Sequence, residues 1–428
     1  MRVPGRASSW LAVGVLAMAI AGAASGGSIA APTDHSGGVA ATKSIASTTP
    51  PSPSTTTTVT PASWPLPEGA TVPAPELAAV SFPQPTAGFG LVSGSENANG
   101  SLPVQLATSS DGGDTWNATG GLLPYAKHPL PVGGNVVPNL AFASTSLGYS
   151  WDQAEIDVTT DGGGHWEVLS DPPGESGTYA VGLVTLVGTS LWVAYGSTSC
   201  QGEFGCPSEI ASWSPTSGWL ELLAQGTSVA AMTTEDSVVD VLVTSPTAPG
   251  QPYAGNFNLL QDDASGGPDG WRESTGTLQC PIDARWVDSM ATVGTTEILA
   301  ECIGSFEAGW AARSYWLTTD VGATWTPRAA DVPSVEEEGT PPSGEAGSLA
   351  TGASRFWVAV TRSTLYASRD GGLNWQTVGV TTGGNGGSGD AVFNGEDGWC
   401  VYQGLGLWGT TDGGATWQQL GVSGVVDS

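Results

Sequence analysis

Apolar and polar residues alternate along this chain in short runs that Gly, Pro, Asp and Ser/Thr residues interrupt. The first clear apolar run is Leu77 to Phe82, and later strand-like segments begin at small-aromatic or apolar-aromatic pairs such as Gly88-Phe89, Gly148-Tyr149, Leu191-Trp192 and Gly398-Trp399. Runs of this length with turn residues between them indicate β-strands. No segment shows a convincing amphipathic helical period. The pattern therefore predicts an all-β protein made of many short strands.

One eight-residue pattern, [S/T]-x-D-x-G-x-x-W, returns five times and sets the spacing of these strands. The hydroxyl and the carboxylate can accept hydrogen bonds from backbone N–H groups of a tight turn, Gly can adopt positive φ, and Trp provides a large packing surface. We therefore interpret the pattern as a structural hairpin corner. Its pattern residues are Ser109, Asp111, Gly113 and Trp116; Thr159, Asp161, Gly163 and Trp166; Thr318, Asp320, Gly322 and Trp325; Ser368, Asp370, Gly372 and Trp375; and Thr410, Asp412, Gly414 and Trp417.

The corner aspartates are 50, 159, 50 and 42 residues apart, so the long interval has room for two more units. Two degenerate copies lie there: residues 214–219 keep Gly and Trp but lose Asp, and residues 262–271 keep Asp, Gly and Trp with an insertion. A unit of about 50 residues holds about four strands, which is the size of a propeller blade. We predict a seven-bladed β-propeller with about four antiparallel strands in each blade.

Ring closure is a separate expectation, because the chain continues for only eleven residues beyond Trp417. The last blade would then lack a strand, and the segment from Trp64 to Val72 would supply it from the N-terminal side.

Three regions are expected along the chain. Arg2 and Arg6 precede an apolar run, Trp10 to Ala24, so residues 1–30 are expected to be a signal peptide, or an N-terminal anchor if they are retained. Residues 31–62 are rich in Ser, Thr and Pro, as in an extended linker. Residues 63–428 form the propeller.

Export permits disulfides, and proximity in sequence pairs Cys200 with Cys206 and Cys280 with Cys302. Cys400 is left over, and its place beside Trp399 in an apolar strand favours a buried, inert thiol.

The five intact corners resemble Asp-box motifs, which are also called bacterial neuraminidase repeats. Asp-box propellers include sialidases, xyloglucan-degrading glycosidases, the sortilin-type receptor domain and the photosystem II assembly and stability factor. The spelling T-T-D-G-G-x-T-W, with a Gly-aromatic strand before it, is most similar to the last group. The resemblance covers residues 80–421, and it implies that the motif residues are structural positions away from any active site.

A sialidase-like or other glycoside hydrolase is the alternative function. The sialidase resemblance would imply three arginines that clamp a carboxylate, but the arginines of residues 63–428 all lie beyond the first three blades: Arg272, Arg285, Arg313, Arg328, Arg355, Arg362 and Arg369. Paired carboxylates of another glycosidase are harder to exclude, since Asp152, Glu155 and Asp157 are close in sequence and Asp236 and Asp240 share strand spacing. In so acidic a chain, chance pairs of solvated carboxylates are also expected.

Other chemistries are disfavoured. The histidines His35, His128 and His165 are scattered, so we expect neither a metal cluster nor a triad, and no cofactor. A formal net charge of −29 disfavours nucleic acid and anionic lipid. The sequence therefore predicts a secreted or cell-surface, monomeric, non-enzymatic scaffold that binds a protein or a glycan, with no membrane contact beyond the N-terminal segment.

Overall fold

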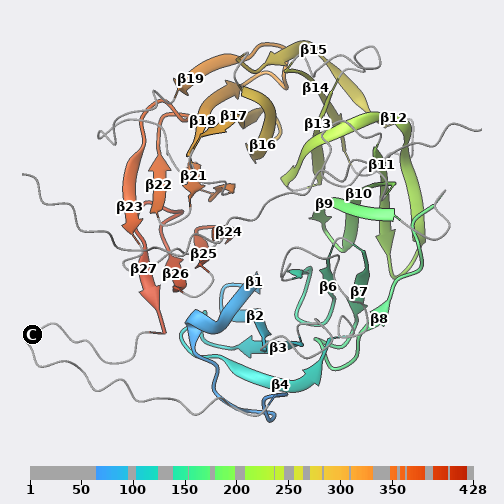
Figure 1. Ribbon diagram of the computed structural model, residues 1–428, viewed down its shortest axis with the longest axis vertical. Coiled ribbons are helices and arrows are strands. Elements are labelled where there is room, and N and C mark those ends of the chain that lie inside the picture. The colour runs from blue at the N-terminus through green and yellow to red at the C-terminus, as the bar shows by residue number, and fades with distance from the viewer. Residues whose placement is uncertain are drawn as a thin grey trace, which may run out of the picture. The chain divides into compact units, whose positions relative to one another are not determined.

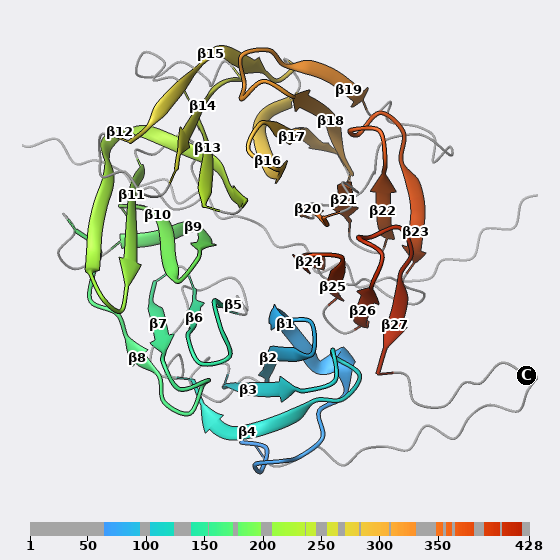
Figure 2. The same cartoon turned by 180° about the vertical axis from the view of Figure 1, so that it is seen from behind.

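The computed structural model describes most of the region from residue 64 to residue 421, and its strands form the seven-bladed β-propeller of Figures 1 and 2. The described residues are 64–94, 103–123, 138–152, 154–173, 179–197, 208–235, 237–244, 255–263, 270–281, 284–307, 310–330, 348–353, 357–361, 364–380, 389–402 and 405–421. The signal-peptide and linker predictions lie outside these ranges. Within them, no helix has the length and apolar character that a bilayer span requires.

Each blade is an antiparallel meander in which the first strand lies innermost and the fourth lies at the rim (Figure 1). A short 3-10 helix, η1 (Ala74–Glu76), precedes the first blade. Blade 1 contains β1 (Leu77–Gln84), β2 (Ala87–Ser93), β3 (Val104–Ser109) and β4 (Asn117–Leu122); blade 2 contains β5 (Asn139–Phe142), β6 (Gly148–Trp151), β7 (Ile156–Thr159) and β8 (Glu167–Val168). Blade 3 contains β9 (Tyr179–Val187), β10 (Ser190–Ser197), β11 (Ser208–Ser214) and the first half of β12 (Gly218–Glu235); blade 4 contains the second half of β12, β13 (Val238–Thr244), β14 (Asn256–Asp262) and β15 (Arg272–Gln279). Blade 5 contains β16 (Ala284–Val293), β17 (Glu297–Glu307), β18 (Trp310–Thr318) and β19 (Thr326–Ala330); blade 6 contains β20 (Leu349–Thr351), β21 (Trp357–Val360), β22 (Thr364–Ser368) and β23 (Gln376–Val380); blade 7 contains β24 (Gly389–Asn394), β25 (Asp397–Tyr402), β26 (Gly406–Thr410) and β27 (Gln418–Leu420).

Seven hydrophobic clusters hold the ring together, one between each pair of neighbouring blades. Each cluster contains one corner tryptophan, which packs its ring against the preceding blade. These are Trp116, Trp166, Trp219, Trp271, Trp325, Trp375 and Trp417 in blades 1 to 7. Two of them, Trp219 and Trp271, belong to the degenerate copies, so packing explains why Trp survives where the rest of the motif has changed.

The small residue before the aromatic in the sequence pattern also has a packing role. In blades 1, 2 and 7 it is a glycine on the second strand, and a phenylalanine of the innermost strand lies over it. A Cβ at Gly88, Gly148 or Gly398 would come within 2.4–2.5 Å of Phe82, Phe142 or Phe393. Only glycine leaves room for that ring.

The innermost strands have an unpaired edge, and side chains of neighbouring blades bond to many of its backbone groups. Phe142 N donates to Ser81 Oγ, Leu349 N donates to Ser289 Oγ and Ala391 N donates to Ser348 Oγ. In the reverse sense, Thr234 Oγ1 donates to Leu186 O, Thr351 Oγ1 donates to Thr292 O and Asn394 Nδ2 donates to Phe82 O. A buried backbone group without a partner is costly, so these bonds stabilise the inner edge.

The prediction of a closing strand from the N-terminal side is wrong. Blade 7 obtains its fourth strand, β27, from the C-terminal part of the chain, and the residues from Gly69 to Val72 lie instead along the outer edge of β4 in blade 1. Gly69 N donates to Ala118 O, and Val72 N donates to Trp116 O. We call residues 64–72 the clasp. The corner residues and turn glycines allowed the blades to be counted. No residue pattern showed whether residues 64–72 would pair with blade 7 or with the outer edge of blade 1.

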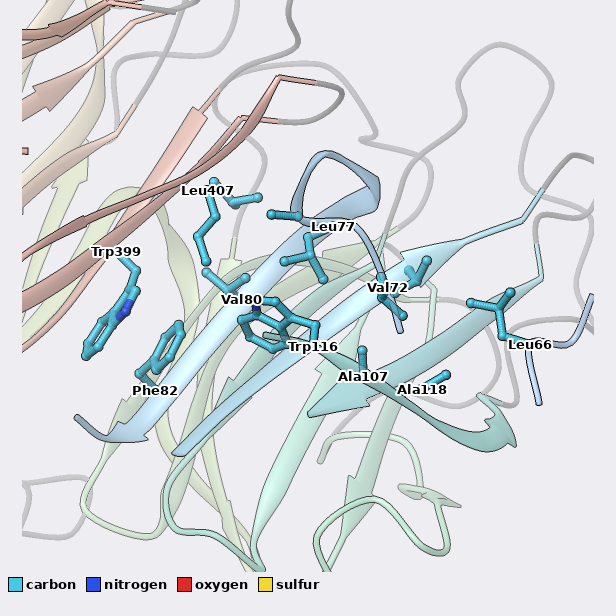
Figure 3. Packing of buried hydrophobic residues seen from close by; sticks show 13 residues of the cluster. Leu66, Val72, Leu77, Val80, Phe82, Ala107, Trp116, Ala118, Trp399 and Leu407 are labelled. Carbon is cyan, nitrogen blue, oxygen red and sulfur yellow. The ribbon is translucent and has the colours of Figure 1, made fainter. Parts of the chain in front are cut away.

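Side-chain packing closes the ring between blades 7 and 1 (Figure 3). The Phe82 and Trp399 rings are stacked with centroids 3.7 Å apart, and Trp116 meets Phe82 edge-on. The same cluster includes Leu77, Val80 and Leu407, and also Leu66 and Val72 of the clasp. Closure therefore uses the same kind of interface as every other blade pair.

Candidate functional site

The five corners share one hydrogen-bond arrangement, which occupies the turn between the third and fourth strands of each blade. In blade 7, Thr410 Oγ1 donates to Asp412 Oδ1 at 2.8 Å and accepts from Gly414 N at 3.1 Å. Asp412 in turn accepts from Thr416 N at 2.9 Å and from Thr416 Oγ1 at 2.7 Å. The same bonds recur in the other four corners, around Asp111, Asp161, Asp320 and Asp370.

These bonds occupy the corner carboxylates and lower the pKa of each. For Asp412, partial burial acts to raise the pKa, but the hydrogen bonds from Thr416 and Thr410 outweigh it. For Asp161, the side-chain and backbone hydrogen bonds of His165 lower the pKa to about 2. A carboxylate that already accepts its hydrogen bonds from its own turn is poorly suited to proton transfer.

The two degenerate corners keep the buried polar residue at the end of the third strand. Ser214 takes this place in blade 3, and its Oγ accepts from Ser217 N at 3.2 Å. In blade 4 the place belongs to Asp262, which is paired with Val239 as Thr318 is paired with Ile298 in blade 5. Asp262 therefore stands where the other corners have Ser or Thr, and not at the position of the motif aspartate; the insertion that follows had concealed this alignment.

A cluster of carboxylates and tyrosines lies at the strand ends away from the corners, between blades 2 and 3. Asp152 and Glu155 form the turn from β6 to β7, where Asp152 Oδ1 accepts from Ala154 N at 2.7 Å and from Glu155 N at 2.9 Å. Asp157 follows on β7 and is fully buried, whereas Asp171, after β8, is exposed. We refer to these four carboxylates, together with Tyr179, Tyr195 and Glu209, as the acid–tyrosine cluster.

Tyr179, at the start of β9, lies within the electrostatic reach of the four carboxylates. Burial, followed by the fields of Asp171, Glu155, Asp152 and Asp157, raises its pKa to about 12. The phenol therefore stays protonated and can donate a hydrogen bond.

Tyr195 extends the cluster into blade 3. Its hydroxyl lies 2.9 Å from Pro173 O and 3.0 Å from Glu209 Oε2, and its ring meets that of Tyr179 edge-on. Five members of the cluster are buried, so a ligand would meet it at Glu155, which is half-buried, and at Asp171, which is exposed. Carboxylates placed there can bind ammonium, guanidinium or sugar hydroxyl groups.

The sequence candidates are thus divided by the structure. Asp152, Glu155 and Asp157 come together in the acid–tyrosine cluster, but Asp240 is buried on β13 of blade 4, and Asp236 lies outside the described residues. Among the arginines, Arg313 is buried beside Glu301, to which it is paired, and Tyr315 Oη donates to the same Glu301 oxygen at 2.9 Å. Within the described ranges, no three His, Cys, Asp or Glu residues are arranged to hold a metal ion.

The innermost strands present mainly small side chains. Ala78, Ala141, Ala180, Gly182 and Ala350 occupy half-buried or exposed positions on them. Asp390 on β24 differs, since it is an exposed carboxylate among these small side chains.

The cysteines of the described region have separate roles. Cys280, just after β15 of blade 4, is joined by a disulfide to Cys302 on β17 of blade 5, with Cα atoms 5.7 Å apart. Cys400 is a buried free thiol whose pKa burial raises well above its usual value. Cys200 and Cys206 lie outside the described residues.

Comparison with known proteins identifies no family for this chain. No family model and no curated protein matches the chain. Similar solved structures include YCF48 bound to a D1 peptide (16% identity, 80% of this chain and 96% of that chain, TM-score 0.48) and YCF48 from Cyanidioschyzon merolae (16%, 80% and 98%, TM-score 0.44). An ancestral GH74 enzyme also matches (12%, 83% of this chain and 47% of that chain, TM-score 0.48), so the chain spans about half the length of that enzyme. Similarities this low carry no argument about activity or partner.

Four members of the acid–tyrosine cluster were not identified from the sequence: Asp171, Tyr179, Tyr195 and Glu209. Each lies within a few residues of a strand end remote from a corner, and they are brought together only by the packing of blade 3 on blade 2. The corners fix the order of the strands, so they also identify which strand ends lie on the opposite side of the propeller. The residues at those ends could have been examined together as one surface.

Proposed function

We propose that this protein is a secreted or cell-surface, non-enzymatic propeller that binds a protein or a glycan partner. Its five intact corners are Asp-boxes that stabilise the blades, and residues 1–30 and 31–62 serve as signal peptide and linker. The observation that carries the proposal is the acid–tyrosine cluster, in which strand ends of two blades bring carboxylates and phenols together on the side away from the corners.

The geometry of the corners supports a structural role for them. Their carboxylates and hydroxyls are engaged with backbone groups of their own turns, and their tryptophans are packed between blades. Ligand recognition is then expected elsewhere, where loops vary between blades.

The inner strands favour binding over glycoside hydrolysis. A glycosidase needs two carboxylates on either side of the scissile bond, roughly 5–10 Å apart. The described residues of the inner strands are largely Ala, Gly, Ser, Thr and Val, with Glu235 at the end of β12, Asp288 on β16 and Asp390 on β24 as the carboxylates. This composition supports a closely packed inner edge more than a catalytic pocket.

Two panels test the proposal with the exported chain: a peptide display library and an array of defined glycans. We expect selective binding that the double variant Glu155→Gln, Asp171→Asn, at the two accessible carboxylates of the cluster, abolishes. The matched control is Asp114→Asn with Glu396→Gln, which alters exposed carboxylates on the corner side. Fluorogenic sialosides and other glycosides should not be turned over, and turnover that one carboxylate substitution abolishes would establish the hydrolase instead.

A further inference from the structure

Asp240 interrupts the sevenfold repetition of the propeller. Asp240 follows Val239, which pairs with Asp262, the polar residue at the end of the third strand of blade 4. The same cross-strand register identifies the residue of each other blade that takes the place of Asp240. In five of the other blades the counterpart packs on the following blade, as Asp240 does, and is buried and apolar or aromatic: Phe89, Tyr149, Leu299, Val358 and Trp399. In blade 3 the residue at this register position, Leu191, is buried against blade 2 instead. A carboxyl group thus occupies a position that elsewhere forms the core between blades.

Its surroundings keep the carboxyl away from water. Asp240 is 0% exposed and lies on the face of β13 that packs on blade 5, as its neighbour Leu242 does. Gln261 Nε2 donates to Asp240 Oδ1 at 2.9 Å and to Thr295 O, in the β16–β17 turn of blade 5, at 3.1 Å. Asp240 Oδ2 has no hydrogen-bond partner. A buried carboxylate with a partner for only one oxygen is destabilising when ionised and much less so when it holds a proton.

None of the charged side chains that the structure describes around Asp240 neutralises its carboxyl. Strand β12 carries Glu235 near Thr233, the residue opposite Asp240, and β14 carries Asp262 on its other face. Blade 5 carries Glu297 two residues after Thr295. The cation on the same face of blade 4 is Arg272, which is exposed and separated from Asp240 by Gln261.

We propose that Asp240 is a proton-dependent latch between blades 4 and 5, which tightens when its carboxyl takes up a proton in mildly acidic surroundings and loosens when the proton leaves. When Asp240 is ionised, the side-chain amide of Gln261 stabilises its charge and also hydrogen-bonds to Thr295 O in the β16–β17 turn of blade 5. Burial, partly opposed by that hydrogen bond, raises the pKa of Asp240 to about 6, above the 3.8 of an exposed aspartate.

Because the pKa of Asp240 is higher in the folded protein than in the unfolded chain, stability falls as pH rises. The folded protein binds this proton more tightly than the unfolded chain, so the contribution to stability is complete below pH 3.8. It declines as pH rises towards 6 and changes little above it. Relative to a variant that cannot ionise here, the wild-type folding constant should fall by roughly tenfold between pH 5 and pH 8.

Urea unfolding of the exported chain between pH 5 and pH 8 tests the latch. Asp240→Asn and Asp240→Val both remove the ionisation, and the second restores the apolar residue type of the other blades. We expect the ratio of the wild-type folding constant to that of each variant to fall about tenfold from pH 5 to pH 8. A wild-type-to-variant ratio that is constant across this range would overturn the proposal.

A second measurement does not depend on the variants folding. Hydrogen exchange of wild type at pH 5 and pH 8, corrected for the intrinsic exchange rate, should show lower protection of β13 and of the β16–β17 hairpin at pH 8 than at pH 5. The blade 7–blade 1 strands β1 and β25 are the internal reference. Equal changes in both regions would contradict a latch local to Asp240.

Discussion

The contact between blades 7 and 1 and the contact between blades 4 and 5 use the same repeat position for opposite chemistry. At the first, this position is Trp399, which stacks on Phe82 and donates through Nε1 to Gly112 O at 2.8 Å. At the second it is Asp240, a buried carboxyl with one unpartnered oxygen. Blades 4 and 5 are neighbours along the chain and are further joined by the Cys280–Cys302 disulfide, whereas blades 7 and 1 are separated by more than 300 residues.

The difference teaches where a propeller can accept a polar group in its core. Two blades joined by the chain and by a disulfide remain close even if their packing weakens. The closing contact depends on noncovalent packing, and large aromatic surfaces are the strongest noncovalent means available. Four changes test this comparison, in order of decreasing expected effect.

Trp399→Ala should be the most damaging, because it removes the stacked ring from the closing contact and leaves a cavity beside Phe82. A loss of about 3–5 kcal/mol in unfolding free energy is expected from urea denaturation. Leu220→Ala, at an exposed site on the outer strand β12, is the control and should have little effect. If Trp399→Ala lowers the unfolding free energy by less than Cys280→Ala with Cys302→Ala does, aromatic packing is not the main stabilising contribution at the closing contact.

Cys280→Ala with Cys302→Ala should cost about 2–4 kcal/mol, since the disulfide restrains the unfolded chain and covers the contact of blades 4 and 5. Thermal unfolding under non-reducing conditions measures the loss. Cys400→Ala, which leaves the disulfide intact, controls for removal of a buried sulfur. If the two variants behave alike, the covalent link is not what offsets the polar core at Asp240.

Gln105→Leu should destabilise blade 1 by about 1–3 kcal/mol, because it leaves two buried backbone groups unpaired. Gln105 is fully buried; its Oε1 accepts from Leu66 N and its Nε2 donates to Leu66 O, each at 2.9 Å, which fixes the clasp. Differential scanning calorimetry gives the shift, with exposed Gln376→Leu as the control. Since Leu66 and Val72 of the clasp belong to the same hydrophobic cluster as Trp399, the two losses should be coupled, and strict additivity with Trp399→Ala would contradict this placement.

Asp412→Ala should have the smallest effect, about 1 kcal/mol at neutral pH, because its hydrogen bonds are partly exposed to solvent. Its pH dependence should be opposite in sign to that of Asp240. The pKa of Asp412 is lowered in the fold, so its contribution is present above 3.8 and is lost as pH falls through the lowered value. Urea titrations at pH 3 and pH 7 measure this, and a difference that grows in acid would refute the corner geometry.

The sequence predicted the fold well because the fold repeats. Ser or Thr, Asp, Gly and Trp at fixed spacing gave the third-to-fourth-strand turn of five blades, and Trp219 and Trp271 marked two more. Those two tryptophans were sufficient because each blade contact needs one large ring, whatever becomes of the turn around it.

The candidate site was less predictable because it does not repeat. Asp152, Glu155 and Asp157 are close in sequence, but their relation to Tyr179 and Glu209 depends on how blade 3 packs on blade 2. Asp240 was noted only for its spacing from Asp236. Its importance became visible when strand register placed it among five apolar or aromatic counterparts.

Every blade outside the continuous strand β12 is built from four strands that follow one another in the chain, including the seventh. A growing polypeptide can therefore complete its blades one at a time as they leave the ribosome, and the final event is the docking of two finished surfaces. Until blade 7 arrives, the aromatic side of blade 1 around Phe82 has no cover. During that interval, apolar side chains of blade 1 that blade 7 covers in the folded protein are open to contact with another chain.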